Sequence, residues 1–268
     1  MQHKLMSLVL AGFCVVCLAA SALAQGNRAP NCTNGTASGT YGYRMSGVLV
    51  GVGPFLVNGF FIHNPDGTSN GRASLVIGNQ QIPANDFTPG TFQTNNDCTG
   101  TGTFFVAALN QQITYNFIAT DGGRQIELLN TNSGIALHGV GRRISQAGRA
   151  PSCNNGTILG TYGYRLDGSV PGAPNLSGAG IETYALDAAF NGTFSGSDTI
   201  SFNGQIVPRT FQGTYKVNSD CTGTGRYTDS LNPNPINFVF VAVDGGRELY
   251  FQGTDPGVII SGVGRRVQ

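Results

Sequence analysis

Residues 97–102, with the sequence DCTGTG, occur a second time as residues 220–225. Each copy lies at the same place inside a longer unit, because four other segments recur around it in the same order. These are RAPNC and RAPSC (28–32, 149–153), GTYGYR (39–44, 160–165), DGGR (121–124, 244–247) and GVGRR (139–143, 262–266). A repeat of this length is a whole domain, so the chain is one domain design present twice.

The first 24 residues have the features of a cleaved signal peptide. A short basic start at 1–4 is followed by an almost wholly apolar run at 5–23, and ALA at 22–24 supplies a cleavage site. A transmembrane anchor is the alternative, but the apolar run is short and meets the cleavage signal at once. We therefore predict a secreted or periplasmic protein with no membrane span after cleavage, and two domains at 25–144 and 145–268.

Four cysteines remain after cleavage: Cys32, Cys98, Cys153 and Cys221. An even number of cysteines in an exported chain is typical of disulfides. Each repeat holds two of them at nearly equal spacing, which predicts the pairs Cys32–Cys98 and Cys153–Cys221. A zinc site is the alternative, but the chain lacks a C-x-x-C pair with a nearby histidine, so we predict no metal.

Charge is scarce and evenly mixed. Only 11% of the residues are charged, and loss of Lys4 with the leader balances the two signs. Nucleic-acid binding needs a concentrated basic surface, and attraction to anionic lipid needs a basic cluster. The sequence therefore predicts neither partner.

Two-residue alternation recurs throughout the chain, and no stretch has the apolar period of a helix. In residues 113–119 the odd positions are apolar, as expected of a strand with one buried face. Turn dipeptides follow at strand-length intervals, at 66–67, 121–122, 191–192, 203–204 and 244–245. This pattern predicts about eight short antiparallel strands in each repeat.

Eight strands in about 120 residues form a sandwich or an up-and-down barrel. The connections are uniformly short, and the first and last strands carry the strongest repeated residues, as expected if they pair and close the sheet. The predicted fold is all-β, with two tandem eight-stranded antiparallel up-and-down β-barrels; β-sandwiches are the alternative. A single sixteen-stranded outer-membrane pore is disfavoured by the non-aromatic end RRVQ at 265–268.

Residues 39–41 (GTY) and the pair Arg142 and Arg143 resemble the calycin pattern of lipocalins and avidins. In that group Gly-x-Trp opens the barrel and an arginine of the last strand packs over the indole. Here tyrosine replaces tryptophan, which the chain lacks altogether. Both repeats are also similar to uncharacterised secreted bacterial tandem-repeat proteins with allene oxide cyclase-like barrels. These resemblances imply a barrel fold and no established activity.

Tyrosines and arginines alternate on the first strand of each repeat. Tyr43 is expected on the inner face and Arg44 on the outer one, and Tyr164 and Arg165 repeat this arrangement. These four residues are the candidate ligand-binding residues, with phenol hydroxyls aimed at a polar group. The alternative is a filled core whose end is sealed by an arginine stacked on an aromatic ring.

The histidines do not recur between the repeats. Ser261 occupies the place of His138, and the region around His63 corresponds to the alanines at 188–189. A Ser-His-Asp triad or histidine metal site common to both domains is therefore excluded.

The repeated acids Asp97 and Asp220 each precede a cysteine and are predicted to form turns. No acid pair has a spacing that forces two carboxylates together, and the glycines never open a helix as a phosphate loop does. We predict no catalytic residue and no cofactor.

The outward face of the predicted sixth strand differs between the repeats. In the second copy its outward positions are Asn237, Val239, Val241 and Val243, and three of these four are apolar. Solvent does not favour three valines, so this face is predicted to meet the first barrel or another subunit.

The predicted function is that of an exported, non-catalytic barrel. It would hold a small apolar or amphipathic molecule in a barrel mouth or serve as a surface-interaction module. The alternative is a cyclase-like enzyme that acts on an apolar substrate in the barrel cavity.

Overall fold

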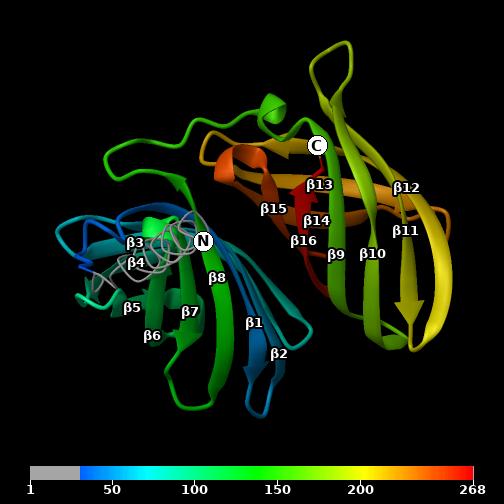
Figure 1. The fold of residues 1–268 in the computed structure, drawn as a ribbon. Coiled ribbons are helices and arrows are strands. Elements are labelled where there is room, and N and C mark those ends of the chain that lie inside the picture. The colour runs from blue at the N-terminus through cyan, green and yellow to red at the C-terminus, as the bar shows by residue number, and fades with distance from the viewer. Residues whose placement is uncertain (1–30, 268) are drawn as a thin grey trace, which may run out of the picture. The chain divides into compact units, whose positions relative to one another are not determined.

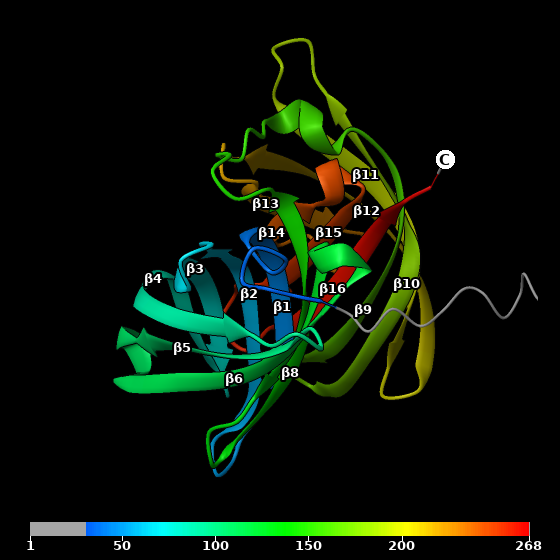
Figure 2. The same cartoon turned by 60° about the vertical axis from the view of Figure 1, so that its left-hand side comes forward.

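The computed structural model describes residues 31–267, so the expected leader at 1–24 lies outside the described part. Two closed eight-stranded antiparallel barrels, β1–β8 and β9–β16, follow one another along the chain (Figure 1, Figure 2). The predicted fold class is confirmed. No helix in this part of the chain is long and apolar enough to cross a membrane.

The first barrel consists of β1 (Gly39–Leu49), β2 (Gly53–His63), β3 (Thr68–Ile77), β4 (Gln80–Thr94), β5 (Thr99–Val106), β6 (Gln111–Thr120), β7 (Gln125–Asn130) and β8 (Ile135–Ser145), with 3-10 turns η1 (Ala107–Leu109) and η2 (Asp121–Gly123). The second consists of β9 (Gly160–Val170), β10 (Ala173–Leu186), β11 (Gly192–Phe202), β12 (Gln205–Val217), β13 (Thr222–Asp229), β14 (Ile236–Val243), β15 (Glu248–Gly253) and β16 (Ile259–Arg266), with η3 (Asn155–Ile158) and η4 (Asp244–Gly246).

Each barrel closes through its own first and last strands. β1 pairs with both β2 and β8, and β9 pairs with both β10 and β16. A closed sheet leaves no unpaired edge strand. The sandwich alternative is therefore wrong, and the strands form two barrels of eight and not one of sixteen.

Burial alternates along the strands as the sequence predicted. On β6 the side chains of Ile113, Tyr115, Phe117 and Ala119 are buried. The Tyr115 ring lies directly against Gly102 of the repeated stretch, where a Cβ would collide with it. Glycine in a strand often marks such a close approach, which explains the glycines of DCTGTG.

The acid of the repeated stretch forms a turn, as predicted. Asp97 Oδ1 accepts hydrogen bonds from the Thr99 backbone N–H (3.0 Å) and hydroxyl (2.6 Å). Asp220 makes the same two bonds to Thr222, at 2.9 and 2.6 Å. Cys98 between them has a left-handed φ of 69°, which the side-chain bonds hold in place.

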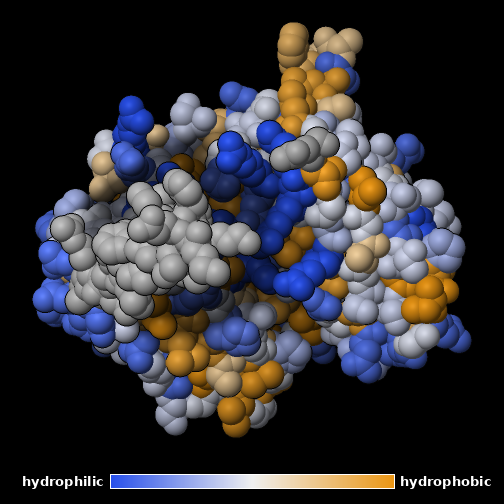
Figure 3. All heavy atoms as spheres, in the orientation of Figure 1, coloured by the Kyte–Doolittle hydropathy of each residue, from blue (hydrophilic) through white to orange (hydrophobic). Residues whose placement is uncertain are grey.

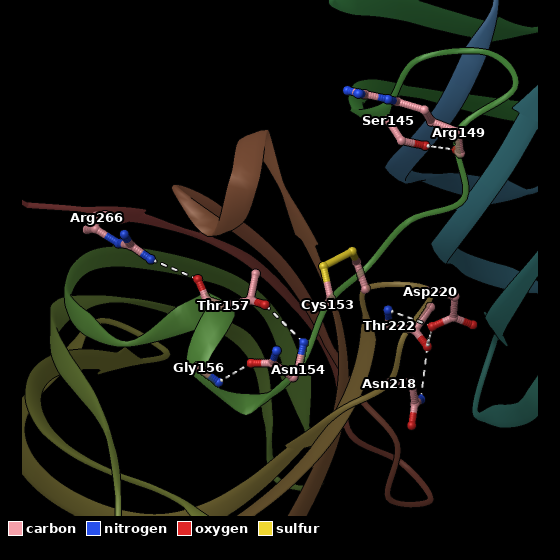
Figure 4. The surroundings of a disulfide bond; sticks show 11 residues. Ser145, Arg149, Cys153, Asn154, Gly156, Thr157, Asn218, Asp220, Thr222 and Arg266 are labelled. Atoms are coloured by element: carbon pink, nitrogen blue, oxygen red, sulfur yellow. Dashed lines mark hydrogen bonds between the residues drawn. A yellow bond between two sulfur atoms is a disulfide. The ribbon is translucent and has the colours of Figure 1, made fainter.

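Both predicted disulfides are present, Cys32–Cys98 and Cys153–Cys221. Each ties the segment before the first strand to the start of the fifth strand of its barrel. Figure 4 shows the second, next to the turn in which the Asn154 side chain caps η3 by accepting from the Gly156 N–H. Closing loops of 66 and 68 residues contributes roughly 4 kcal/mol each. Two disulfides are consistent with an extracytoplasmic protein.

An arginine and a tyrosine lock the same end of each barrel. Tyr41 donates to the Gly123 carbonyl (2.6 Å), and Arg143 Nη2 donates to the Tyr41 hydroxyl (2.9 Å) with its guanidinium 5.4 Å from the ring centre. In the second barrel, Arg266 Nη2 donates to the Tyr162 hydroxyl (3.0 Å), and its guanidinium lies 5.5 Å from the ring centre. An arginine therefore lies over the first-strand ring, as the sequence resemblance implied.

Candidate functional site

Each barrel encloses a cavity with a free volume of about 50 Å³. That space has room for on the order of four water molecules. The first cavity has apolar walls apart from a few hydroxyl and amide groups, whereas glutamate and arginine line the second. The two copies therefore enclose different chemistry.

The four candidate ligand-binding residues separate into two groups. Tyr43 lines the first cavity and Tyr164 lines the second. Arg44 and Arg165 lie at the alternate, outward positions of β1 and β9, and neither lines a cavity. The tyrosines are the part of the predicted set that the structure brings to a cavity.

Arg209 of β12 holds two buried aspartates beside the second cavity. It donates to Asp198 from Nε (3.0 Å) and Nη2 (2.7 Å), and to Asp229 from Nη1 (2.8 Å). The rings of Phe211 and Tyr227 each lie 5.7 Å from the guanidinium carbon. This two-pronged pairing compensates buried charges that would otherwise be very costly.

Tyr164 is oriented by this cluster. Its hydroxyl donates to Asp198 Oδ2 at 2.5 Å, a short bond to a charged acceptor. Burial first, and then the bond to Asp198, raises the pKa of Tyr164. The phenol proton is therefore committed to Asp198, and the oxygen lone pairs are left to accept a hydrogen bond.

Glu182 of β10 is a second acid on the cavity wall. Its side chain is 6% exposed, and its Oε1 has no hydrogen-bond partner in residues 31–267. Burial raises the pKa of Glu182 to about 8, a hydrogen bond with Tyr184 lowers it, and the charge of Asp198 raises it further. At neutral pH the carboxyl is mainly protonated and can donate a hydrogen bond.

The pairing of the strands identifies the residues of the first barrel that correspond to the charged residues of the second. Glu182 lies opposite Tyr162, and Phe61 lies opposite the matching Tyr41. The same reasoning gives neutral counterparts to the other charged residues: Ala73 for Asp198, Asn85 for Arg209 and Val106 for Asp229. The whole charged cluster therefore belongs to one copy of the repeat.

His63 is enclosed in the first barrel. It is fully buried, its ring stacks on Phe92 at 3.9 Å, and its Nδ1 lies 3.2 Å from the Ala37 carbonyl. Burial lowers the pKa of His63 to about 3, so the ring is neutral and carries one proton. A carbonyl only accepts, so Nδ1 holds that proton and Nε2 accepts from the Tyr115 hydroxyl at 3.0 Å.

The sequence comparison misplaced the counterpart of His63. Gly39 pairs with His63, and the matching Gly160 pairs with Tyr184. The counterpart is thus Tyr184 and not the alanines at 188–189, since each residue lies 24 positions after the first glycine of its GTYGYR motif. The burial and the two hydrogen bonds of His63 are those of a core residue.

Reasoning from repeated residues missed the acids and the arginine of the second cavity. The strand pattern does contain a signal for them. Asp198 shares the inward face of β11 with Phe194 and Ile200, both buried. A charged residue in register with buried apolar ones must be paired or functional. In residues 31–267 no three His, Cys, Asp or Glu side chains gather as a metal site requires.

Apolar residues also gather on the hairpin that joins β1 and β2. Val48, Val50 and Val52 are 47%, 70% and 58% exposed. Figure 3 shows apolar surface at the lower edge of the molecule, where this hairpin lies in Figure 1. Three residues that line the first cavity lie at this same end of the barrel: Phe55, Val106 and Leu109.

No protein-family model matches the chain, and no curated protein matches it in sequence. Among solved structures, kievitone hydratase from Nectria haematococca is similar with a TM-score of 0.28 and 11% identity, over 89% of this chain and 93% of that one. A protein of unknown function from the DUF3598 family of Nostoc punctiforme is similar with a TM-score of 0.27 and 13% identity, over 87% and 97%. These similarities are distant and carry no information on function.

Proposed function

We propose that the second barrel binds a small, neutral, mostly apolar molecule that carries a hydroxyl group. The observation that carries this proposal is the unpartnered carboxyl oxygen of Glu182, buried on the wall of a mainly apolar cavity. A protonated Glu182 can donate to the ligand oxygen, and the Tyr164 oxygen can accept the ligand proton. Arg209 is already paired with two aspartates, which favours a neutral ligand over an anion.

This proposal is tested with 2-propanol, whose size suits a cavity with room for about four waters, and with isobutane, which has the same shape without the hydroxyl. Binding is measured from NMR shifts of the backbone amides around the second cavity, and wild type is expected to bind 2-propanol more tightly than isobutane. Glu182→Gln keeps a donor and retains that preference, whereas Glu182→Leu loses it by about tenfold in Kd, the equivalent of one hydrogen bond.

Phe61→Leu changes the matching position of the first barrel and serves as the control, with no expected effect on the preference. Equal binding of 2-propanol and isobutane by wild type would contradict the proposal. So would an unchanged preference in Glu182→Leu.

A second candidate is a cyclase-like enzyme that converts an apolar substrate in the same cavity. Glu182 favours it, since a protonated carboxyl in an apolar site is a suitable proton donor. Mass spectrometry of the molecule released from protein purified from its native cells separates the candidates. A single compound released unchanged after incubation supports binding, and conversion supports the enzyme.

We infer that the protein is exported to the periplasm or the cell exterior, as the two disulfides support. Membership of a calycin-like or allene oxide cyclase-like group is likewise our proposal. It is supported by barrel closure between first and last strands and by the arginine over the first-strand tyrosine.

We also propose that the outward face of β14 packs against the first barrel. Residues 32–267 lie within one compact unit. Val241 and Val243 are fully buried, in an apolar cluster that includes Val140 and Ile144, and Val239 is half-buried. Burial of these side chains outside the cavity supports the proposal.

Polar contacts support the same interface. Asn58 Nδ2 donates to the Tyr250 carbonyl at 2.9 Å, and both groups are buried. Arg142 Nε lies 2.9 Å from Glu248 Oε2. Directional contacts of this kind fix the register of two packed surfaces.

Val241→Lys is expected to separate the barrels while each still folds, because it places an ammonium group in a fully buried apolar position. The sedimentation coefficient should fall and the unfolding transition should broaden or split. Ile118→Lys is the matched control, since Ile118 holds the same position in the first repeat and is 49% exposed. A Val241→Lys variant that sediments and melts like wild type would show that the face is not an interface.

A further inference from the structure

The contact proposed above between the barrels joins two different faces. The first barrel contributes the outward side of its first two strands, where a Cβ on Gly42 would collide with Val241 and Val243. The second contributes the outward side of its sixth and seventh strands, which carries those valines and Tyr250. We call these the first-strand face and the sixth-strand face. Both barrels follow the same plan, so one face of each kind is left over.

The two faces that are left over expose apolar side chains. On the first-strand face of the second barrel, Ile181 is 54% exposed. On the sixth-strand face of the first barrel, Ile118 and Leu129 are 49% and 53% exposed. By strand pairing these two match Val241 and Gln252, both of which are buried. Large apolar side chains gathered on a surface often indicate an interaction site.

Gly163 is the counterpart of Gly42, and the space above it is open. Among the described residues, a Cβ on Gly163 would meet one atom within 4 Å, Val267 Cγ1 at 3.7 Å, which is an ordinary contact. Its φ is not left-handed, so the turn of the chain does not require glycine there. Glycine in a strand often marks a site where another surface approaches closely. Gly163 can therefore receive Ile118 as Gly42 receives Val241.

The charges of the two exposed faces are complementary. Within the chain, the Arg44 guanidinium lies 5.6 Å from the centre of the Tyr250 ring. Their counterparts on the exposed faces are Arg165 and Glu127. Glu127 accepts a hydrogen bond from Gln125, and no described residue forms an ion pair with either side chain. Opposite charges at matching places favour this pairing, whereas two identical faces would bring like charges together.

We propose that a second copy of this chain binds head to tail. The first-strand face of one chain's second barrel covers the sixth-strand face of the other chain's first barrel. Arg165 pairs with Glu127, and Ile118 packs on Gly163. This inference rests on the contact proposed above for β14 and repeats it between chains. Two chains can close a ring through two such contacts, and more chains can form an open array.

The contact between chains is expected to be weaker than the contact within one chain. The short segment between β8 and β9 holds the two barrels at a high effective concentration, which separate chains lack. Association should therefore depend on protein concentration. Sedimentation velocity of the mature full chain over a concentration series measures it, and the average sedimentation coefficient of wild type should rise with concentration.

Charge reversal tests the pairing directly. Glu127→Arg and Arg165→Glu each place like charges at the contact, and each should raise the dissociation constant at least tenfold. Both positions are exposed, so each variant should melt like wild type. An equimolar mixture of the two variants should associate as wild type does, because every contact between unlike chains then joins opposite charges. Recovery on mixing cannot come from a folding defect in either variant.

A second test uses the matching glycines. Gly163→Val fills the open space and should abolish association while the barrels stay together within the chain. Gly42→Val collides with Val241 and should instead separate the two barrels of one chain. The earlier comparison of Val241→Lys with Ile118→Lys is made at concentrations below those at which chains associate, because Ile118 lies in the face proposed here.

Three results would overturn the inference. The first is a wild type that stays monomeric at about 1 mM, where only a very weak contact escapes detection. The second is a mixture of the two charge variants that associates no better than either alone. The third is unchanged association of Gly163→Val. If Val241→Lys separates the barrels and any of these results is found, only the head-to-tail contact fails; if Val241→Lys changes nothing, both contacts fail.

Discussion

Glu182→Gln is expected to abolish a fall in stability of roughly 4 kcal/mol between pH 4.5 and pH 8. Burial, opposed by the bond with Tyr184, raises the pKa of Glu182 from 4.5 in the unfolded chain to about 8 in the folded one. In that window the unfolded chain releases the proton and the folded chain keeps it. The free energy of unfolding therefore falls as the pH rises from 4.5, and becomes level above pH 8.

The glutamine variant has no proton to lose and keeps a group that can bond Tyr184. It should match wild type near pH 4 and exceed it above pH 8 by most of that amount. Chemical denaturation followed by circular dichroism measures this, since the chain has no tryptophan. Glu127→Gln, at an exposed position of the first barrel, is the control. Parallel stability curves for Glu182→Gln and wild type across this window would disprove a buried, protonated Glu182.

His63→Phe is expected to remove a pH dependence of similar size and opposite sign. Burial lowers the pKa of His63 from 6.5 in the unfolded chain to about 3 in the folded one, against the opposing bond to the Ala37 carbonyl. As the pH falls from 6.5 to 3, the unfolded chain takes up a proton that the folded chain refuses. The free energy of unfolding of wild type should therefore drop by roughly 4 kcal/mol over this range.

The phenylalanine variant loses two hydrogen bonds and should be less stable than wild type at pH 7. Its disadvantage should shrink, and then reverse, as the pH falls. The same unfolding series between pH 7 and pH 3 measures this, and His138→Phe is the control, because His138 is exposed. A constant difference between His63→Phe and wild type would mean that the buried ring is not held neutral.

The two groups act in different barrels, so their effects can be assigned. Of these two groups, only His63 contributes a slope below pH 4.5, and only Glu182 contributes one above pH 6.5. Between these values the two slopes oppose each other, and their sum is nearly level. If the barrels unfold in separate transitions, each should show one slope only.

The architecture could be predicted from sequence because it rests on features that both copies share. Alternation in residues 113–119, the glycines under Tyr115 and the cysteine spacing each restrict the backbone, and each is present twice. Pairing of the first strand with the last followed from the placement of the GTYGYR and GVGRR motifs. Each of these features constrains the backbone of its own barrel, so both copies need it to fold in the same way.

The site could not be predicted in the same way, because its chemistry lies where the copies differ. A search for shared residues discards Glu182 and Arg209, whose counterparts are Phe61 and Asn85. The pairing of Arg209 with two aspartates joins three strands, and no sequence spacing reveals such a contact. The exchange of His63 for Tyr184 could have been found from the sequence, because each lies 24 positions after the first glycine of its GTYGYR motif.

The disulfide and the arginine–tyrosine lock lie at one end of each barrel, and the cavity linings extend toward the other. Each barrel is therefore a cup with a rigid base and a rim of hairpins. If the second barrel binds a ligand as proposed, the ligand is expected to cross the rim, because a disulfide and an arginine–tyrosine contact hold the base together. On that proposal the hairpins would set the rate of ligand exchange, whereas the base would set the stability of the barrel. Because the two properties depend on different residues, either can change in one copy without affecting the other.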